Sequence, residues 1–298
     1  MNYAKITIKP TSPFISEFQS DTIFGHFAWG VRFLYGEDRL KELLSDFEDN
    51  PFIIFSDGFL KGYLPKPFLK PKSLDCSEIE DAKRVKKISL VKKEFIFENI
   101  DSLNDDKLFE YLKNQQIDLN SKTHITQKNS VNRDTSIVTE GLYTIKEKFI
   151  DNEYEIYFAY QRISQDEIIE VFNFIAKRGY GKDKSAGKGK FKFQIDWDFK
   201  EKKYFKRQKD SNKYLNLSTM FYNKDKMKLY FGKSITKFPK AGGYYAYSEP
   251  FKNPCIMYVS GSTFIVGDGI LGKAESSVYN KQNHFQNGYS VGIYFDGE

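Results

Sequence analysis

Cysteine and histidine are both scarce in this chain. Its 298 residues include 2 cysteines, Cys76 and Cys255, and 3 histidines, and the two cysteines lie far apart in the sequence. This spacing excludes a disulfide framework and the paired cysteines of a zinc site. Isolated thiols are typical of a reducing compartment. We therefore expect a cytoplasmic protein that binds no metal and no cofactor.

Long apolar segments are also absent. No apolar run approaches the ~20 residues of a membrane-spanning helix, and the amino terminus has no apolar signal core. We expect no membrane partner. The net charge of +6 is moderate, but basic residues cluster at 83–93, 122–133 and 182–192. Such clustering makes a nucleic-acid partner credible.

Residues 179–193 form a stretch rich in glycine and lysine, GYGKDKSAGKGKFKF. Glycine permits positive φ and close approach of a bulky anion to backbone N–H groups, and lysine supplies positive charge there. This Gly-rich loop suits a phosphate backbone, although a solvated lysine-rich turn has the same composition. A nucleotide-hydrolysing loop is excluded, because a helix precedes this loop and a strand follows it, the reverse of the Walker order.

The flanking elements predict an α+β fold. Ser164 and Glu167 form a capping box for a helix that ends at Gly179, and 190–197 alternates as a strand. Upstream, we expect strands at 3–9, 52–55 and 153–160, a helix from the N-cap residues 20–22 to Gly36, and a short helix at 37–47. The order is βαββαβ, a ferredoxin-like domain over residues 1–200 with an insertion at about 58–150.

The first predicted helix is apolar on two faces. Thr22, His26, Trp29 and Phe33 share the second face, which must be covered by another domain, a partner subunit or RNA. A histidine among aromatic residues is more typical of packing than of catalysis.

Two stretches of the insertion are informative. Residues 121–143 predict a polar β-hairpin that contains Asn129, Asn132 and Arg133, side chains able to bind sugar and phosphate. Residues 81–93 form a basic amphipathic stretch or a solvated linker. In the predicted topology, the start of the first helix, the insertion and the Gly-rich loop emerge at one end. We expect them to form an anion-attracting surface.

Residues 201–298 predict a smaller, β-rich second domain. A charged linker at 200–213 precedes short strands, and few helical patterns occur. We interpret this part as a degenerate ferredoxin-like unit. The expected strands are 229–231, 243–247, 256–260, 263–266 and 289–295.

Several motifs give the sequence a family resemblance. The Gly-rich loop resembles that of the RAMP superfamily of CRISPR RNA-binding proteins. More narrowly, residues 20–26 (SDTIFGH), 129–135 (NSVNRDT), 250–252 (PFK) and Gly261-Ser262 resemble the fourth subunit of type III-A (Csm) effector complexes. Position 136 is serine where a glycine is expected. The resemblance implies a non-catalytic subunit that grips the repeat-derived 5′ tag of crRNA, docks the large polymerase-like Cas subunit and adjoins a backbone RAMP subunit.

The resemblance also implies which residues contact RNA. The implied residues are Lys182, Lys184, Ser185, Gly187, Lys188, Gly189, Asn129, Asn132 and Arg133. The predicted topology adds Ser20 and Thr22 at the start of the first helix, and His26 is a further candidate. Two alternatives stay open. One is a metal-independent ribonuclease of the RAMP type, for which His26 is the only histidine expected near the RNA. The other is a scaffold that contacts only protein, which leaves the lysine loop without a role.

Overall fold

The computed structural model describes residues 1–73, 78–115, 121–131, 135, 138–207, 211–242, 249–279 and 284–297. The chain begins with β1 (Asn2–Pro10), α1 (Ser20–Leu44), β2 (Ile53–Phe55), β3 (Phe59–Leu60), β4 (Tyr63–Pro65), α2 (Ile79–Lys87), β5 (Leu90–Lys92), α3 (Lys93–Glu98) and α4 (Asp105–Asn114). It continues with β6 (Ser121–Val131), β7 (Val138–Ile150), β8 (Tyr154–Tyr160), α5 (Gln165–Arg178) and β9 (Phe191–Asp196). The remainder contains β10 (Lys213–Asn216), β11 (Met227–Phe231), β12 (Ser234–Lys237), β13 (Cys255–Tyr258), β14 (Thr263–Val266), β15 (Gly272–Glu275), β16 (Gln286–Tyr289) and β17 (Gly292–Phe295). Short 3-10 turns occur at Lys184–Ala186 and Lys200–Phe205.

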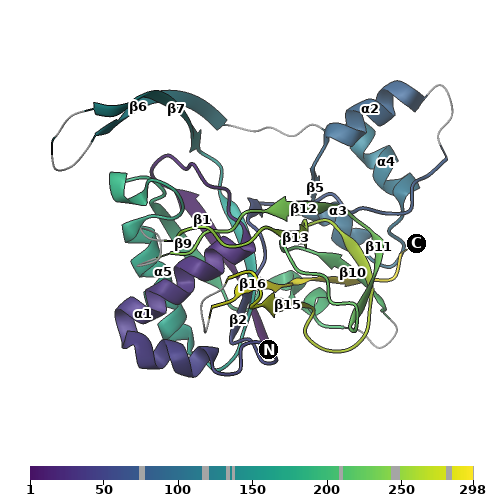
Figure 1. Ribbon diagram of the computed structural model, residues 1–298. Coiled ribbons are helices and arrows are strands. Elements are labelled where there is room, and N and C mark those ends of the chain that lie inside the picture. The colour runs from purple at the N-terminus through teal and green to yellow at the C-terminus, as the bar shows by residue number, and fades with distance from the viewer. Residues whose placement is uncertain are drawn as a thin grey trace.

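The first sheet confirms the predicted ferredoxin-like fold. Its strands run in the order β2-β8-β1-β9, all antiparallel to their neighbours, and β3 extends it beside β8. In β1, alternate residues face the core, and Ile6 pairs with Ile156 on one side and with Ile195 on the other. Helices α1 and α5 lie side by side (Figure 1). They approach closely because Gly30 has no side chain, since a Cβ there would lie 2.7 Å from Val171 Cγ1.

The capping signals had different outcomes in the two main helices. The capping box of α5 is present, with both the Ser164 and the Glu167 hydrogen bonds formed. The N-cap predicted for α1 is wrong. The N-cap residue is Gln19, which makes no side-chain cap hydrogen bond, and the Ser20 N–H that follows it donates to Asp57 Oδ1 at 2.8 Å. Gly36 (φ 89°) breaks α1 where the sequence predicts the boundary between two helices.

The insertion contains more regular structure than the sequence predicts. The predicted loop at 58–72 includes β3 and β4, and β4 pairs with β5. Much of the basic stretch at 81–93 folds as α2, which packs beside α4. Strands β6 and β7 form the predicted hairpin, which projects from the body of the chain on the side away from α2 (Figure 1).

The second sheet repeats the strand order of the first. Its strands run β11-β14-β10-β17, which is again second, third, first and fourth of four strands. The described connections between them contain loops and hairpins in place of helices, as expected of a degenerate ferredoxin-like unit. β10 lies at the end of the predicted charged linker, and the strand predicted at 243–247 lies outside the described residues.

The two sheets share one hydrophobic core. Buried residues from β10 and β17, including Leu215 and Ile293, belong to the same cluster as Ile54 and Phe55 of β2. The Asp57 N–H also donates to the Leu217 carbonyl at 2.8 Å. The division at about residue 200 remains a prediction.

None of the helices in the described ranges is both long enough and apolar enough to span a bilayer.

Candidate nucleic-acid interface

Two glycines lie where the two ends of the Gly-rich loop meet. This closure, formed by Gly179, Tyr180 and Gly189, is here named the neck of the loop. The Tyr180 N–H donates to the Gly189 carbonyl at 2.9 Å. Gly179 (φ 90°) and Gly189 (φ 73°) both adopt positive φ, which strongly favours glycine. A Cβ at Gly179 would lie 2.2 Å from the Lys188 oxygen, and one at Gly189 would lie 2.0 Å from the Tyr180 oxygen. The neck therefore requires glycine at both positions, and Gly189 is buried in it.

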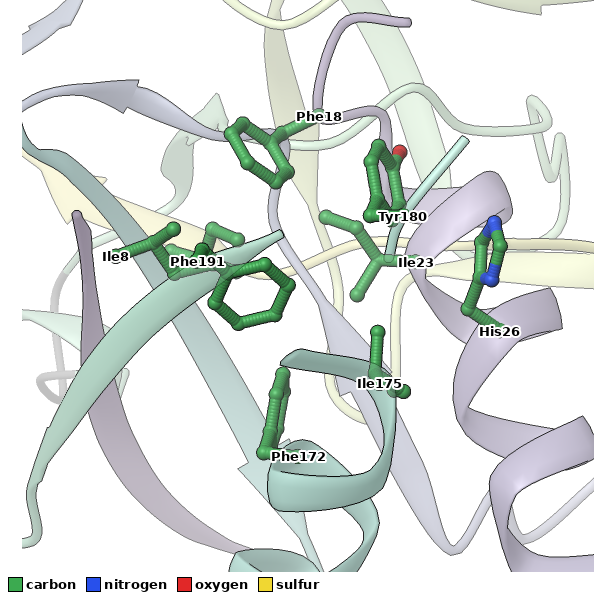
Figure 2. Close-up of a pocket in the computed structure, with 9 residues that line it drawn as sticks. Ile8, Phe18, Ile23, His26, Phe172, Ile175, Tyr180 and Phe191 are labelled. Carbon is green, nitrogen blue, oxygen red and sulfur yellow. The ribbon is translucent and has the colours of Figure 1, made fainter. Parts of the chain in front are cut away.

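Tyr180 anchors the loop in the core below it. Its hydroxyl donates to the Glu17 carbonyl at 2.9 Å, and its ring lies 4.9 Å from the Phe18 ring and 4.8 Å from the His26 ring. Figure 2 shows Phe18 and Tyr180 above apolar residues of β1, α5 and β9, with His26 to one side on α1. The gap between them measures about 10 Å³, at the lower limit for one water molecule. It is a packing gap that is too small to hold a ligand.

The segment before α1 supports the loop from outside. Ser16 Oγ accepts from the Lys182 N–H at 2.9 Å, and Ser12 Oγ accepts from the Lys190 N–H at 2.8 Å. The Pro13 carbonyl accepts from the Gly189 N–H at 2.9 Å. The sequence predictions missed these residues. Their only local signal is a pair of serines beside a proline between a strand and a helix.

His26 is part of this support. Its Nε2 accepts a hydrogen bond from the Gly181 N–H at 3.0 Å. Burial, with a smaller effect of the nearby Lys184 charge, lowers the pKa of the imidazole to about 3. The ring is therefore neutral near pH 7, and its basic nitrogen already has a donor.

Two ion pairs join the loop to the β6/β7 hairpin. Lys188 Nζ lies 2.7 Å from Glu147 Oε2, and Lys128 Nζ lies 2.5 Å from Asp183 Oδ2. Glu147 is buried, with 4% of its side chain exposed. The positive charge of Lys188 is thus largely offset inside the protein. Neither acidic partner was singled out from sequence, because each pair joins distant segments.

The tip of the loop is open. Lys182, Lys184, Ser185 and Gly187 are exposed, and neither Lys182 nor Lys184 forms an ion pair with a residue that the structure describes. A Cβ at Gly187 would meet nothing within 4 Å, and its φ is 82°. The tip therefore presents backbone and two unneutralised lysines to solvent.

The hairpin lies at the same end as the loop. An antiparallel bridge joins Phe14 to Lys148 of β7, and Asn129 is exposed on β6. Asn132 and Arg133 lie outside the described residues. The predicted convergence of the hairpin and the loop is confirmed for the parts that the structure describes.

The start of α1 differs from the prediction of an open, anion-attracting helix terminus. Ser20 is 1% exposed, its hydroxyl donates to the Thr219 carbonyl, and its N–H donates to Asp57. Asp21 is also buried there and pairs with Lys237 at 2.6 Å. Two carboxylates therefore occupy the positive end of the helix dipole. Thr22 is half-buried, and its N–H donates to Asp21.

Metal ligands do not gather in the part of the chain that the structure describes. Within those residues, no three His, Cys, Asp or Glu side chains form a group that could hold an ion. The arrangement is suited to electrostatic and backbone binding of an anionic chain.

Comparisons with known proteins identify similar folds. No protein-family model and no curated protein sequence matches the chain. Among solved structures, a chain of the Csm3-Csm4 subcomplex of a type III-A CRISPR-Cas interference complex has a TM-score of 0.61 at 18% identity, covering 98% of this chain and 99% of that one. A chain of a Csm1-Csm4 cassette in complex with cA4 has a TM-score of 0.61 at 15% identity, and one from the cassette with AMPPNP has 0.59 at 17%; each covers 99% of this chain and 98% of its own. At these identities the likeness shows a shared fold over almost the whole of both chains.

Proposed function

We propose that this chain is a Csm4-like RAMP subunit of a type III-A CRISPR effector complex, located in the cytoplasm, which holds the repeat-derived 5′ tag of crRNA without cleaving it. The whole-length likeness supports this, because Csm4 is the component common to the Csm3-Csm4 and Csm1-Csm4 structures. By the same likeness, we propose that its protein partners are a large polymerase-like Cas subunit and a backbone RAMP subunit.

The observation that carries the proposal is the construction of the Gly-rich loop. Its neck is fixed by Gly179, Tyr180 and Gly189, while its tip exposes Lys182 and Lys184 without carboxylate partners in the described ranges. A preformed loop loses little conformational entropy on binding. The exposed lysines and the backbone at Gly187 suit phosphate groups, which carry most of the affinity for nucleic acid.

The hairpin is the second proposed contact. Because Lys128 and Lys188 tie it to the loop, RNA held by the loop tip would meet Asn129 and the chain that follows it. In this proposal Ser20 and Lys188 position the site rather than contact RNA, since the first is buried and the second is paired.

A non-catalytic role fits the environment of His26. A general base needs a free lone pair near the reacting hydroxyl and a pKa near the working pH. The Nε2 of His26 already accepts from Gly181, and its pKa is about 3. This supports a binding subunit over a metal-independent ribonuclease of the RAMP type.

The test is RNA binding by the full chain copurified with the large Cas subunit, in EDTA, with product sizing on a gel. Labelled RNAs with and without the tag are compared for wild type and for the double variant Lys182→Ala, Lys184→Ala. The matched control is Lys83→Ala, Lys87→Ala, which removes two exposed lysines from α2.

Tag-dependent binding that the loop variant weakens at least tenfold, with the control and the RNA unchanged, supports the proposal. Equal binding by both variants contradicts it and favours a protein scaffold. Cleavage that disappears in His26→Ala would establish a ribonuclease.

A further inference from the structure

Three aromatic rings and two arginines form a continuous surface on α1 and α5, here named the arginine–aromatic strip. The Trp29 and Phe33 ring centroids lie 5.7 Å apart, and Phe33 and Phe174 lie 5.6 Å apart. Arg178 lies over both Phe33 (5.2 Å) and Phe174 (5.0 Å), and Arg32 lies over Trp29 at 5.1 Å. Alternating rings and guanidinium groups are the elements of a stacking surface.

The strip is accessible to a ligand. Phe33 is 59% exposed, and Arg178 is exposed and makes no ion pair in the described ranges. A guanidinium that stacks on a ring keeps its N–H donors directed outward, where they can bind phosphate. Arg32 pairs with Glu37 at 2.9 Å, so Arg178 is the arginine left to bind a phosphate, and the exposed Phe33 ring beside it can stack on a base.

The strip continues from the Gly-rich loop. Arg178 directly precedes Gly179, and the Lys184 side chain packs so close that a Cβ on Gly179 would lie 3.2 Å from Lys184 Cβ. Although Lys184 is exposed at the surface, partial desolvation of its ammonium group, together with the nearby charge of Arg178, lowers the pKa of this lysine. The His26 ring contacts the loop at Gly181. Phe33 follows His26 by seven residues, and this separation is ~10 Å along the helix axis.

We propose that the arginine–aromatic strip is a second RNA subsite, where a base of the single strand stacks on Phe33 while its phosphate binds Arg178. This rests on the proposed function. Because Phe33 is only ~10 Å along α1 from His26, which contacts Gly181 of the loop, one single strand could contact both the loop and the strip. The path ends where α1 and α5 become acidic, at Glu170, which accepts from Tyr35, and at Glu167, which pairs with Arg39.

The charges favour RNA over a protein at this surface. Arginine and aromatic residues are enriched at protein interfaces too, but lysine is depleted there, and a protein partner would have to cover the exposed Lys177 beside Arg178. An RNA strand neutralises both and accepts the rings as stacking partners, whatever its sequence.

The test uses the same copurified pair and a tagged single-stranded RNA with 2-aminopurine placed at each tag position in turn. Stacking quenches this fluorophore, so the position that contacts Phe33 is identified directly. The variants are Phe33→Leu, which keeps an apolar side chain, and Phe33→Tyr, which keeps the ring. The control is Phe251→Ala, because Phe251 is 67% exposed and also lies under a cation, Lys240 at 4.8 Å.

We expect quenching at one position, lost in Phe33→Leu with about tenfold weaker binding, retained in Phe33→Tyr, and unchanged in the control. If Phe33→Leu binds and quenches like wild type while the loop double variant is weakened, the strip is not an RNA subsite and the proposed function still stands. If Phe33→Leu loses the large subunit instead of RNA, the strip docks protein and the inference is overturned. If wild type binds no RNA, both proposals fail.

Discussion

The Nε2 atom of His26 accepts a hydrogen bond of 3.0 Å from the backbone N–H of Gly181. This contact joins the first helix of the ferredoxin-like domain to a loop that lies 155 residues later in the chain. Because the Tyr180 ring also packs against the His26 ring at 4.8 Å, the histidine both orients and supports the loop. His26 therefore has a structural role.

The pH dependence of stability tests that role. Since the folded pKa of about 3 is below the ~6.5 of an exposed histidine, the unfolded chain binds a proton between these values and the folded chain does not. The contribution of His26 is therefore complete above ~6.5 and is lost as pH falls towards 3. We expect His26→Gln, which keeps an acceptor, to lose less stability than wild type between pH 7.5 and 5 in urea unfolding. Parallel curves would contradict a half-buried His26 that stays neutral in the folded chain.

Glycine substitutions test the neck of the loop. Gly189→Ala combines a positive φ with a Cβ 2.0 Å from the Tyr180 oxygen, so it should cost more than the ~1–2 kcal/mol of the backbone conformation alone and abolish RNA binding. Gly187→Ala, at φ 82° with open space around it, should lower the free energy of unfolding by only the ~1–2 kcal/mol of the backbone conformation. Gly25→Ala, inside α1 with no atom within 4 Å, should be neutral or stabilising by up to ~1 kcal/mol. Equal melting temperatures for the three variants would refute this assignment.

Lysines of the same loop should differ in their effect on stability. Lys188→Ala leaves the buried Glu147 carboxylate without its partner, which we expect to cost about 1.5–3 kcal/mol. Lys182→Ala should change stability by less than ~0.5 kcal/mol and reduce the salt dependence of RNA binding by about one unit of slope. Adding Glu147→Gln to Lys188→Ala should restore part of the stability. No recovery in the double variant would show that the pair is not the cause.

Local signals predicted much of the fold. The capping box of Ser164 and Glu167 is a contact within one turn, and the alternation of β1 depends only on which residues face the core, so both are visible in sequence. β10 was missed because Lys213–Asn216 follows a charged segment, and its pairing with β14 and β17 and its burial in the shared core depend on distant residues. The N-cap predicted for α1 was also wrong. The Ser20 N–H at the start of this helix donates to Asp57, which lies 37 residues away and is not visible as a local signal.

The residues of the candidate site also divide into those that local sequence patterns predict and those that only distant contacts determine. The glycine pattern identified the loop, because positive φ at Gly179 and Gly189 is a property of those residues themselves. Its supports at Ser12, Ser16 and Glu147 could not be predicted, since each contacts the loop across 41 or more residues. Which lysines stay free for a ligand depends on these distant partners.

The contact of α1 with β12 and β16 supplies a further prediction. Asp21, with 5% of its side chain exposed, is held by Lys237 of β12 at 2.6 Å and by Gln286 at 2.7 Å. Lys237→Met leaves a buried carboxylate without its cation, which should cost ~3 kcal/mol. Because the hydrophobic core is continuous, we expect one cooperative unfolding transition, shifted as a whole. Two transitions, of which only one shifts, would show that the two parts fold independently.

The most direct test of the central claim is to map where the tag lies. The copurified pair would be bound to RNA that carries 4-thiouridine at single tag positions, irradiated, digested and analysed by mass spectrometry. If the Gly-rich loop holds the tag, crosslinks will form to residues 179–189 and to the β6/β7 hairpin and will be lost in the Lys182→Ala, Lys184→Ala variant. Crosslinks confined to α2–α4 or to the second sheet, with none at the Gly-rich loop, would contradict it.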